Sequence, residues 1–129
     1  LIGCNSKSRT ESLKEQFKKE IQNVQVQIIF GDSHLGIEEL SDKTIDWLFL
    51  NTDNSYENTT VLLEASQSKV KDAGLIIGSN YTMGDWMTSQ RFGVVEAVNT
   101  FSKKYGWELL YLTNESNRNL SYALRRIHH

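Results

Sequence analysis

The chain has 129 residues, and its 14 basic and 16 acidic side chains give a net charge of −2. This length is enough for a hydrophobic core, and the near-balanced charge argues against nucleic acid as the main partner. The single cysteine excludes an internal disulfide, and no apolar run is long enough for a membrane helix or secretory signal. We therefore predict a cytoplasmic domain with neither nucleic-acid nor membrane partners.

The two ends of the sequence bear on its organisation. The chain begins at Leu1, inside an apolar run, which suggests that further residues precede it in the native protein. His128 and His129 are interpreted equally well as native residues or as the remnant of a purification tag. We expect one domain over residues 1–127.

Strand-like and helix-like segments alternate in the first third of the chain. Leu13, Phe17 and Ile21 recur at every fourth position, which is typical of one face of an amphipathic helix. The elements predicted here are a strand over residues 1–4, a helix over 10–22, a strand over 24–30 and a short helix over 34–40.

The most apolar stretch is the segment 45–50, Ile-Asp-Trp-Leu-Phe-Leu. Such a run is typical of a parallel strand that is buried on both faces. It is followed at once by the polar residues Asn51, Thr52, Asp53 and Asn54. Ligands of open parallel sheets bind outside the carboxyl ends of the strands, so we expect the functional site at this point.

The alternation continues to the end of the chain. Asn54 or Ser55 is expected to cap a helix that runs to about residue 71. The loop 82–89 is rich in bulky side chains and suggests a lid or the wall of a ligand site. The remaining predicted elements are a strand over 75–78, a helix over 90–105, and strands over 107–112 and 120–127. No helix separates the last two strands, so an antiparallel pair is expected.

Together these elements predict an α/β fold, a three-layer sheet that is mostly parallel and ends in an antiparallel strand pair. The order of motifs resembles the class I S-adenosylmethionine-dependent methyltransferases. It is most similar to the small-molecule and sugar O-methyltransferases, whose fourth strand is followed by Asp-Gly-Asp-His-Ser-Tyr-Glu. The corresponding segments here are Asn-Thr-Asp-Asn-Ser-Tyr-Glu at 51–57, Gly-Asp-Ser at 31–33, Ala-Gly-Leu-Ile-Ile-Gly at 73–78 and Gly-Val-Val-Glu-Ala-Val at 93–98.

The resemblance implies a Rossmann-like sheet whose first strand is missing. Residues 1–5 correspond to the second strand of the family, so the first strand and its Gly-rich cofactor loop would lie upstream. Without the first strand, the second and fourth strands would lack a shared neighbour and leave backbone groups unpaired. We favour upstream residues over another segment or chain as the source of that strand.

The resemblance also implies S-adenosylmethionine as the cofactor. Asn5 stands where the family has an acidic residue that binds the ribose, and it can still accept one such hydrogen bond. Asp32 and Ser33 correspond to the residues near the adenine, although Asp32 is interpreted equally well as a turn or helix cap. Asn51 completes the expected cofactor-binding set.

The expected catalytic residues are Asp53, Asn54 and Asn80. Methyl transfer depends largely on alignment, and a base matters when the acceptor hydroxyl must lose its proton. Asp53 is the candidate base, because Asn54 replaces the histidine of the family. Tyr81 and Trp86 are expected to bind the acceptor. The alternative is that Asp53 and Asn54 only cap the following helix and that Trp86 is a packing residue.

Members of the family that bind a metal use carboxylates after the fourth and fifth strands. This chain has Asn51, Ser79 and Asn80 there, so we predict no metal. Two functions stay open: an O-methyltransferase acting on a small molecule or sugar, and a catalytically inactive domain of the same fold that serves as a binding or structural module. Retention of Asp32, Asp53 and the Ser-Tyr-Glu turn at 55–57 favours the first function. The second is favoured by the loss of an ionisable group at five family positions: Asn5, Asn51, Asn54, Ser79 and Asn80. A homo-oligomer stays open.

Overall fold

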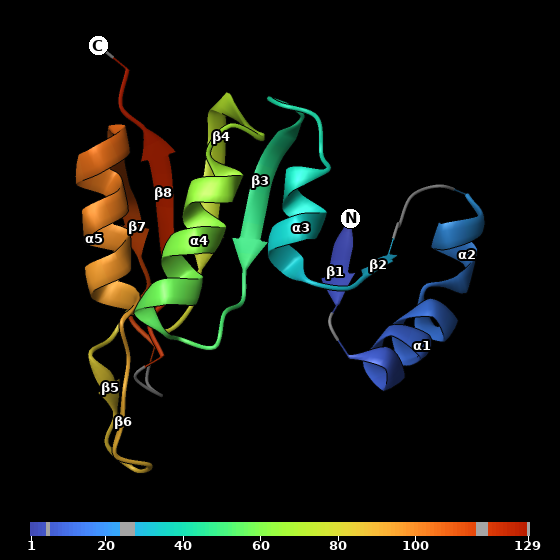
Figure 1. Cartoon of the computed structure of the whole chain (residues 1–129), viewed down its shortest axis with the longest axis horizontal. Coiled ribbons are helices and arrows are strands. Elements are labelled where there is room, and N and C mark those ends of the chain that lie inside the picture. The colour runs from blue at the N-terminus through green and yellow to red at the C-terminus, as the bar shows by residue number, and fades with distance from the viewer. Residues whose placement is uncertain (5, 24–27, 116–118, 129) are drawn as a thin grey trace. The chain divides into compact units, whose positions relative to one another are not determined.

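The computed structural model describes residues 1–4, 6–23, 28–115 and 119–128 (Figure 1). By its internal contacts the chain divides into two compact units, Leu1–Leu40 and Ser41–His129. Each unit is described by itself, and the single domain expected over residues 1–127 stays a prediction. None of the described helices has both the length and the apolar character needed to cross a membrane.

The first unit combines two short parallel strands with three helices. Strand β1 pairs with strand β2 in parallel, with Ile2 opposite Ile28. Residues 24–27 of the predicted second strand lie outside the described residues, and its remaining part forms β2. The elements are β1 (Ile2–Cys4), α1 (Lys7–Gln16), α2 (Lys18–Gln22), β2 (Ile28–Phe30) and α3 (Ser33–Glu38).

The single helix predicted over residues 10–22 is wrong in two respects. Helix α1 begins three residues earlier, because Ser6 caps it and accepts a hydrogen bond from the backbone N–H of Arg9 at 3.4 Å. The helix then ends at Phe17, whose φ of −106° and ψ of 25° separate α1 from α2. The apolar spacing therefore located the helical region but did not locate its break.

The second unit is built on a four-stranded mixed sheet in the order β3-β4-β8-β7. Strands β3 and β4 are parallel, and β8 is antiparallel to both β4 and β7. The predicted α/β class and its C-terminal antiparallel pair are confirmed. The elements are β3 (Ile45–Leu50), α4 (Tyr56–Ser66), β4 (Val70–Gly78), β5 (Gly84–Asp85), β6 (Gln90–Arg91), α5 (Val94–Tyr105), β7 (Trp107–Leu112) and β8 (Tyr122–Arg126).

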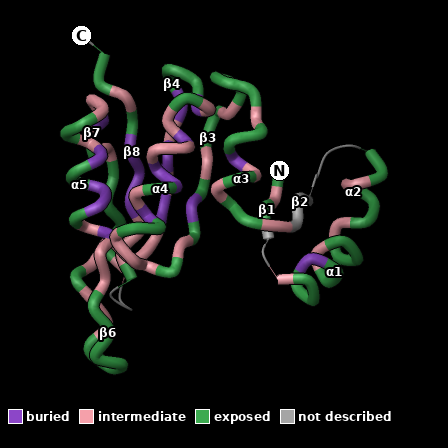
Figure 2. Tube along the Cα trace, in the orientation of Figure 1, coloured by how far each residue is buried: buried purple, intermediate pink, exposed green. Residues whose placement is uncertain are grey.

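The core of this unit lies between the sheet and helices α4 and α5. Figure 2 shows the buried residues concentrated along β4, β8 and α5. Burial of one large apolar side chain contributes roughly 1.5–3 kcal/mol, so this layer is the main source of stability in the unit. Five side chains that are at most 2% exposed define it: Leu63, Ile76, Val98, Phe101 and Leu124.

The expectation that residues 45–50 are buried on both faces is wrong. Leu50 is 5% exposed, whereas Trp47 and Phe49 are 66% and 51% exposed. Side chains alternate along a strand, so Leu50 lies on one face of β3, and Trp47 and Phe49 lie on the other, exposed face. Strand β3 is also at the edge of its four-stranded sheet.

Several predicted boundaries shift where long-range pairing overrides the local pattern. Strand β4 begins at Val70 rather than residue 75, because Val70 pairs with Ile45 and is fully buried. Helix α4 therefore ends at Ser66 rather than near residue 71. Helix α5 begins at Val94, because the preceding residues form β6. Gly106 ends α5 in the left-handed region, with φ of 70°.

Candidate functional site

The candidate site lies in the loops that follow β3 and β4. These strands are parallel and Leu50 pairs with Gly78, so their carboxyl ends lie next to each other. The loop after β3 and the loop after β4 therefore meet at one edge of the sheet, where open sheets bind ligands. Gly78 is required there, since a Cβ at this position would overlap the ring of Tyr122.

The structure joins two of the predicted catalytic residues, Asn54 and Asn80. The side-chain N–H of Asn80 donates to the side-chain oxygen of Asn54 at 2.9 Å. Both residues have left-handed backbones, with φ of 67° and 60°. The backbone of Asn54 also donates to the Thr52 hydroxyl at 3.1 Å and accepts from the N–H of Gly93 at 2.8 Å. Strained conformations held by several contacts often lie at functional sites.

Asp53 is held against the start of helix α4. One carboxylate oxygen accepts from the backbone and the hydroxyl of Ser55 at 3.0 and 2.7 Å, and the other accepts from the side-chain amide of Asn58 at 2.7 Å. These hydrogen bonds, led by that of the Ser55 hydroxyl, lower the pKa of Asp53 below its ordinary value. The N-cap of α4 is Ser55, whose hydroxyl accepts from the backbone N–H of Asn58 at 3.2 Å, so Asp53 contacts the capping residue rather than capping the helix itself. A general-base role for Asp53 stays a prediction.

Tyr81 is fixed by contacts within the second unit. Its hydroxyl donates to the side-chain oxygen of Asn99 on α5 at 2.8 Å, and its ring centroid is 5.8 Å from that of Tyr122. Tyr122 is 2% exposed, and burial raises the pKa of its phenol above the ordinary value. Tyr81 therefore has a defined orientation beside Asn80, and its role in acceptor binding stays a prediction.

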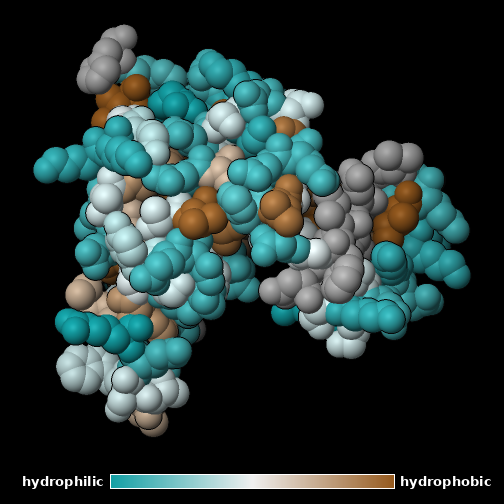
Figure 3. All heavy atoms as spheres, viewed as in Figure 1, coloured by the Kyte–Doolittle hydropathy of each residue, from teal (hydrophilic) through white to brown (hydrophobic). Residues whose placement is uncertain are grey.

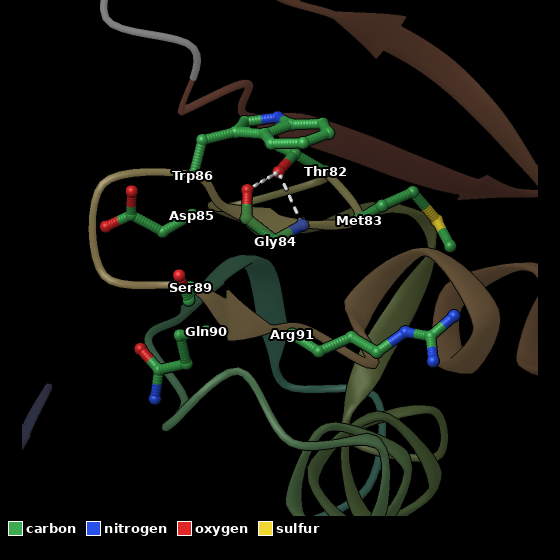
Figure 4. A pocket seen from close by; sticks show the side chains of 8 residues that line it. All are labelled: Thr82, Met83, Gly84, Asp85, Trp86, Ser89, Gln90 and Arg91. Carbon is green, nitrogen blue, oxygen red and sulfur yellow. Dashed lines mark hydrogen bonds between the residues drawn. The ribbon is translucent and has the colours of Figure 1, made fainter.

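The loop that contains Trp86 forms a short hairpin of strands β5 and β6. A cavity of about 620 Å³ opens at this hairpin (Figure 4). Trp86 is 85% exposed and lies at the cavity, and its role in acceptor binding stays a prediction. In Figure 3 the hairpin, at the lower left, carries pale and tan surface of intermediate to apolar hydropathy. The lining residues are Thr82, Met83, Gly84, Asp85, Trp86, Ser89, Gln90 and Arg91.

A second cavity, of about 500 Å³, lies at the starts of α4 and α5. It shares Met83 and Arg91 with the first cavity. Met83 belongs to the loop 82–89, which the sequence indicates as a lid or ligand-site wall. The other residues of this cavity were not predicted to bind a ligand, because they come from separate segments of the chain. The lining residues are Ser55, Tyr56, Glu57, Met83, Arg91, Phe92, Gly93 and Glu96.

The predicted cofactor-binding residues are divided between the two units. Asp32 caps α3 and accepts from the backbone N–H of His34 at 2.9 Å, and Ser33 is the first residue of that helix. Asn51, in the other unit, is exposed, and its side chain makes no hydrogen bond with the described residues. Asn5 lies outside the described residues. The joint role of these residues in a cofactor site stays a prediction.

Among the described residues, no group of three or more histidine, cysteine, aspartate or glutamate side chains could hold a metal ion.

Several solved structures of other proteins have a similar architecture. No protein-family model matches the chain, and no curated protein sequence matches it. Solved structures do match. They include a candidate caffeoyl-CoA O-methyltransferase from Staphylococcus aureus (18% identity, TM-score 0.70), an SAH-bound methyltransferase from Podospora anserina (15%, 0.70) and a ribosomal protein L11 methylase from Lactobacillus delbrueckii subsp. bulgaricus (16%, 0.60).

These matches cover almost the whole chain but only part of the other proteins. They include 95%, 98% and 98% of this chain, and 62%, 59% and 56% of the three solved chains. The chain thus spans less than two thirds of the length of each. At such low identity the likeness shows the fold, so the chain has the fold of the class I S-adenosylmethionine-dependent methyltransferases.

Proposed function

We propose that this chain belongs to an S-adenosylmethionine-dependent O-methyltransferase that acts on a small molecule or sugar. The observation that carries the proposal is the Asn54–Asn80 pair at the carboxyl ends of β3 and β4, within a methyltransferase fold. The candidate O-methyltransferase from Staphylococcus aureus and the SAH-bound methyltransferase support the reaction class and the cofactor.

The chemistry of the predicted cofactor-binding residues fits this cofactor. Asp32 uses one carboxylate oxygen for the helix cap, and its second oxygen has no partner among the described residues. Asn51 offers both a donor and an acceptor. These groups match the amine and hydroxyl groups of an adenosine moiety. The cofactor, when bound, supplies an activated methyl group on a positively charged sulfonium.

In this proposal the chain contributes to catalysis mainly by aligning the acceptor with the methyl group of the cofactor. Asn54 and Asn80 fix the two loops against each other, and Tyr81 is fixed beside them. A lowered pKa makes Asp53 a weak base, so the proposed enzyme suits an acceptor whose hydroxyl ionises readily. Correct placement of acceptor and methyl group then supplies most of the rate enhancement.

Calorimetric titration of S-adenosylmethionine and S-adenosylhomocysteine into the full-length protein tests the proposal. The variant Asp32→Asn retains a capping side chain but loses the charge, and Glu11→Ala changes an exposed acid on α1 as the control. We expect saturable binding that weakens at least tenfold in the Asp32 variant and is unchanged in the control. A folded protein that binds neither compound would overturn the proposal and support the catalytically inactive domain.

A further inference from the structure

The two cavities at the β5–β6 hairpin are adjacent, because Met83 and Arg91 line both. The first cavity has a mainly apolar lining and includes the exposed ring of Trp86. The second cavity is lined by ionisable groups and by Ser55, the residue directly after Asn54 of the candidate catalytic pair. A ligand that filled both would have an apolar body and a charged end.

Arg91 is the positive group of these two cavities. In Figure 4 its side chain and that of Met83 extend in the same direction, away from Trp86. Its guanidinium makes no hydrogen bond or ion pair with any described residue. Arginine stays ionised at all physiological pH values and binds carboxylates through two parallel hydrogen bonds. The exposed, unpaired guanidinium of Arg91 is therefore available to bind an anion.

Two carboxylates, Glu57 and Glu96, line the second cavity together with Arg91. They lie in the first turns of α4 and α5, where acidic residues also offset the helix dipole. Neither forms an ion pair with a described residue. Elsewhere in this unit lysine and arginine do pair with acids: Lys43 with Asp72, Lys69 with Asp42, Lys71 with Asp46, Lys104 with Glu64 and Arg125 with Glu108.

The backbone holds these charges in a fixed arrangement. The N–H of Gly93 donates to the carbonyl of Asn54 at 2.8 Å, which ties the start of α5 to the start of α4. Gly93 also lies so close to Tyr56 that a Cβ would overlap the Tyr56 backbone. Glu57 and Glu96 therefore project from two helix ends that cannot move apart without breaking this contact.

We propose that the two cavities bind a zwitterionic, amino-acid-like small molecule with an apolar or aromatic body. The carboxylate of the ligand pairs with Arg91, and its ammonium group lies between Glu57 and Glu96. The apolar body contacts Met83 and the ring of Trp86. A purely anionic ligand would be repelled by the two glutamates, and a purely cationic ligand would leave Arg91 unpaired. Only the identification of this ligand as the methyl acceptor rests on the proposed function.

Three probes with the same aromatic body separate the two charges. L-phenylalanine carries both, phenethylamine carries only the ammonium group and 3-phenylpropionate carries only the carboxylate. In calorimetric titrations of the full-length protein we expect L-phenylalanine to bind at least tenfold tighter than either of the other two. Equal or weaker binding of L-phenylalanine would overturn the proposal.

Variants assign each charge to its residue. Arg91→Gln should abolish the advantage of L-phenylalanine over phenethylamine, and Arg91→Lys should restore part of it. The double variant Glu57→Gln, Glu96→Gln should abolish its advantage over 3-phenylpropionate. Lys103→Gln, which changes an exposed cation on α5, is the control and should bind like the parent. Circular dichroism verifies folding, and unchanged preferences in folded variants would contradict the assignment.

The same samples distinguish this inference from the proposed function. S-adenosylmethionine, which also carries an ammonium group and a carboxylate, is titrated into the parent protein, into Arg91→Gln and into Asp32→Asn. Binding counts as cofactor binding only if Asp32→Asn weakens it and Arg91→Gln leaves it unchanged. If the cofactor binds while none of the three probes does, the inference fails and the proposed function stands. If L-phenylalanine binds with the expected preferences while the cofactor does not, the zwitterion site stands and the methyltransferase proposal fails.

Discussion

The side-chain amide of Asn80 donates a 2.9 Å hydrogen bond to the side-chain oxygen of Asn54 and so connects the loops after β3 and β4. Both residues have positive φ, which asparagine tolerates better than most residues. The left-handed turn in each loop orients the asparagine side chain, so the side-chain hydrogen bond and the two backbone conformations stabilise each other. This relationship leads directly to a stability experiment.

Asn80→Ala and Asn80→Gly separate the hydrogen bond from the backbone conformation. Both lose the bond to Asn54, which is worth about 1 kcal/mol. Alanine at a φ of 60° adds a further cost of about 1 kcal/mol, and glycine does not. Urea unfolding should therefore show that the alanine variant is less stable than the glycine variant. Equal free energies of unfolding would contradict a left-handed backbone at this position.

The lowered pKa of Asp53 leads to a prediction for the pH dependence of the free energy of unfolding. Hydrogen bonds from Ser55 and Asn58 lower its pKa in the folded state below the ordinary 3.8. A lowered carboxyl pKa contributes stability that is present above pH 3.8 and is lost as the pH falls through the folded-state value. The stability difference between the parent and Asp53→Asn should be constant from pH 5 to 8, on the linkage argument, and should shrink below about pH 4. A difference that persists unchanged at pH 3 would contradict these contacts.

The sequence allowed much of the fold to be predicted, because its strongest signals are local. The apolar run at 45–50 identifies β3 directly, and the cap signal at Asn54 or Ser55 identifies the start of α4, where the structure has Ser55 as the cap. The exposure of Trp47 was not predictable, because burial of the second face of a strand depends on what covers it. A run of apolar residues indicates a strand, but it does not show whether a helix layer covers the second face of that strand.

The candidate site was predictable in position but only partly in composition. The rule that ligands bind at strand ends located Asn54 and Asn80 correctly at one edge. Their hydrogen bond joins residues that are 26 positions apart, so no local pattern indicates it. Arg91 was included in a predicted helix, and its place at the two cavities follows from the β5–β6 pairing instead.

Gly93→Ala tests the close approach of the α4 and α5 starts. The added Cβ would overlap the backbone of Tyr56, and overpacking of this kind costs about 2 kcal/mol. Gly3→Ala is the matched control, since a Cβ there meets nothing within 4 Å. Urea unfolding should show a large loss of stability only for Gly93→Ala. A neutral Gly93 variant would mean that the two helix starts are not in contact.

The three tryptophans differ enough in exposure to be separated by acrylamide quenching of fluorescence. Trp107 is 2% exposed, with its ring 5.7 Å from that of Phe101 and the Arg126 guanidinium 4.7 Å from its centroid. Trp86 and Trp47 are 85% and 66% exposed. Because quenching requires collision with the ring, Trp86→Phe should lower the quenching constant and Trp107→Phe should raise it.

The same measurement reports on the hairpin cavity. Trp86 lies at the cavity that we assign to the apolar body of the ligand, whereas Trp107 lies in the core. Saturating L-phenylalanine should therefore lower the quenching constant of the parent protein, since the bound ring covers the indole of Trp86. It should leave the quenching constant of Trp86→Phe unchanged. Equal protection in that variant would show that the ligand covers a different tryptophan and would exclude Trp86 from the site.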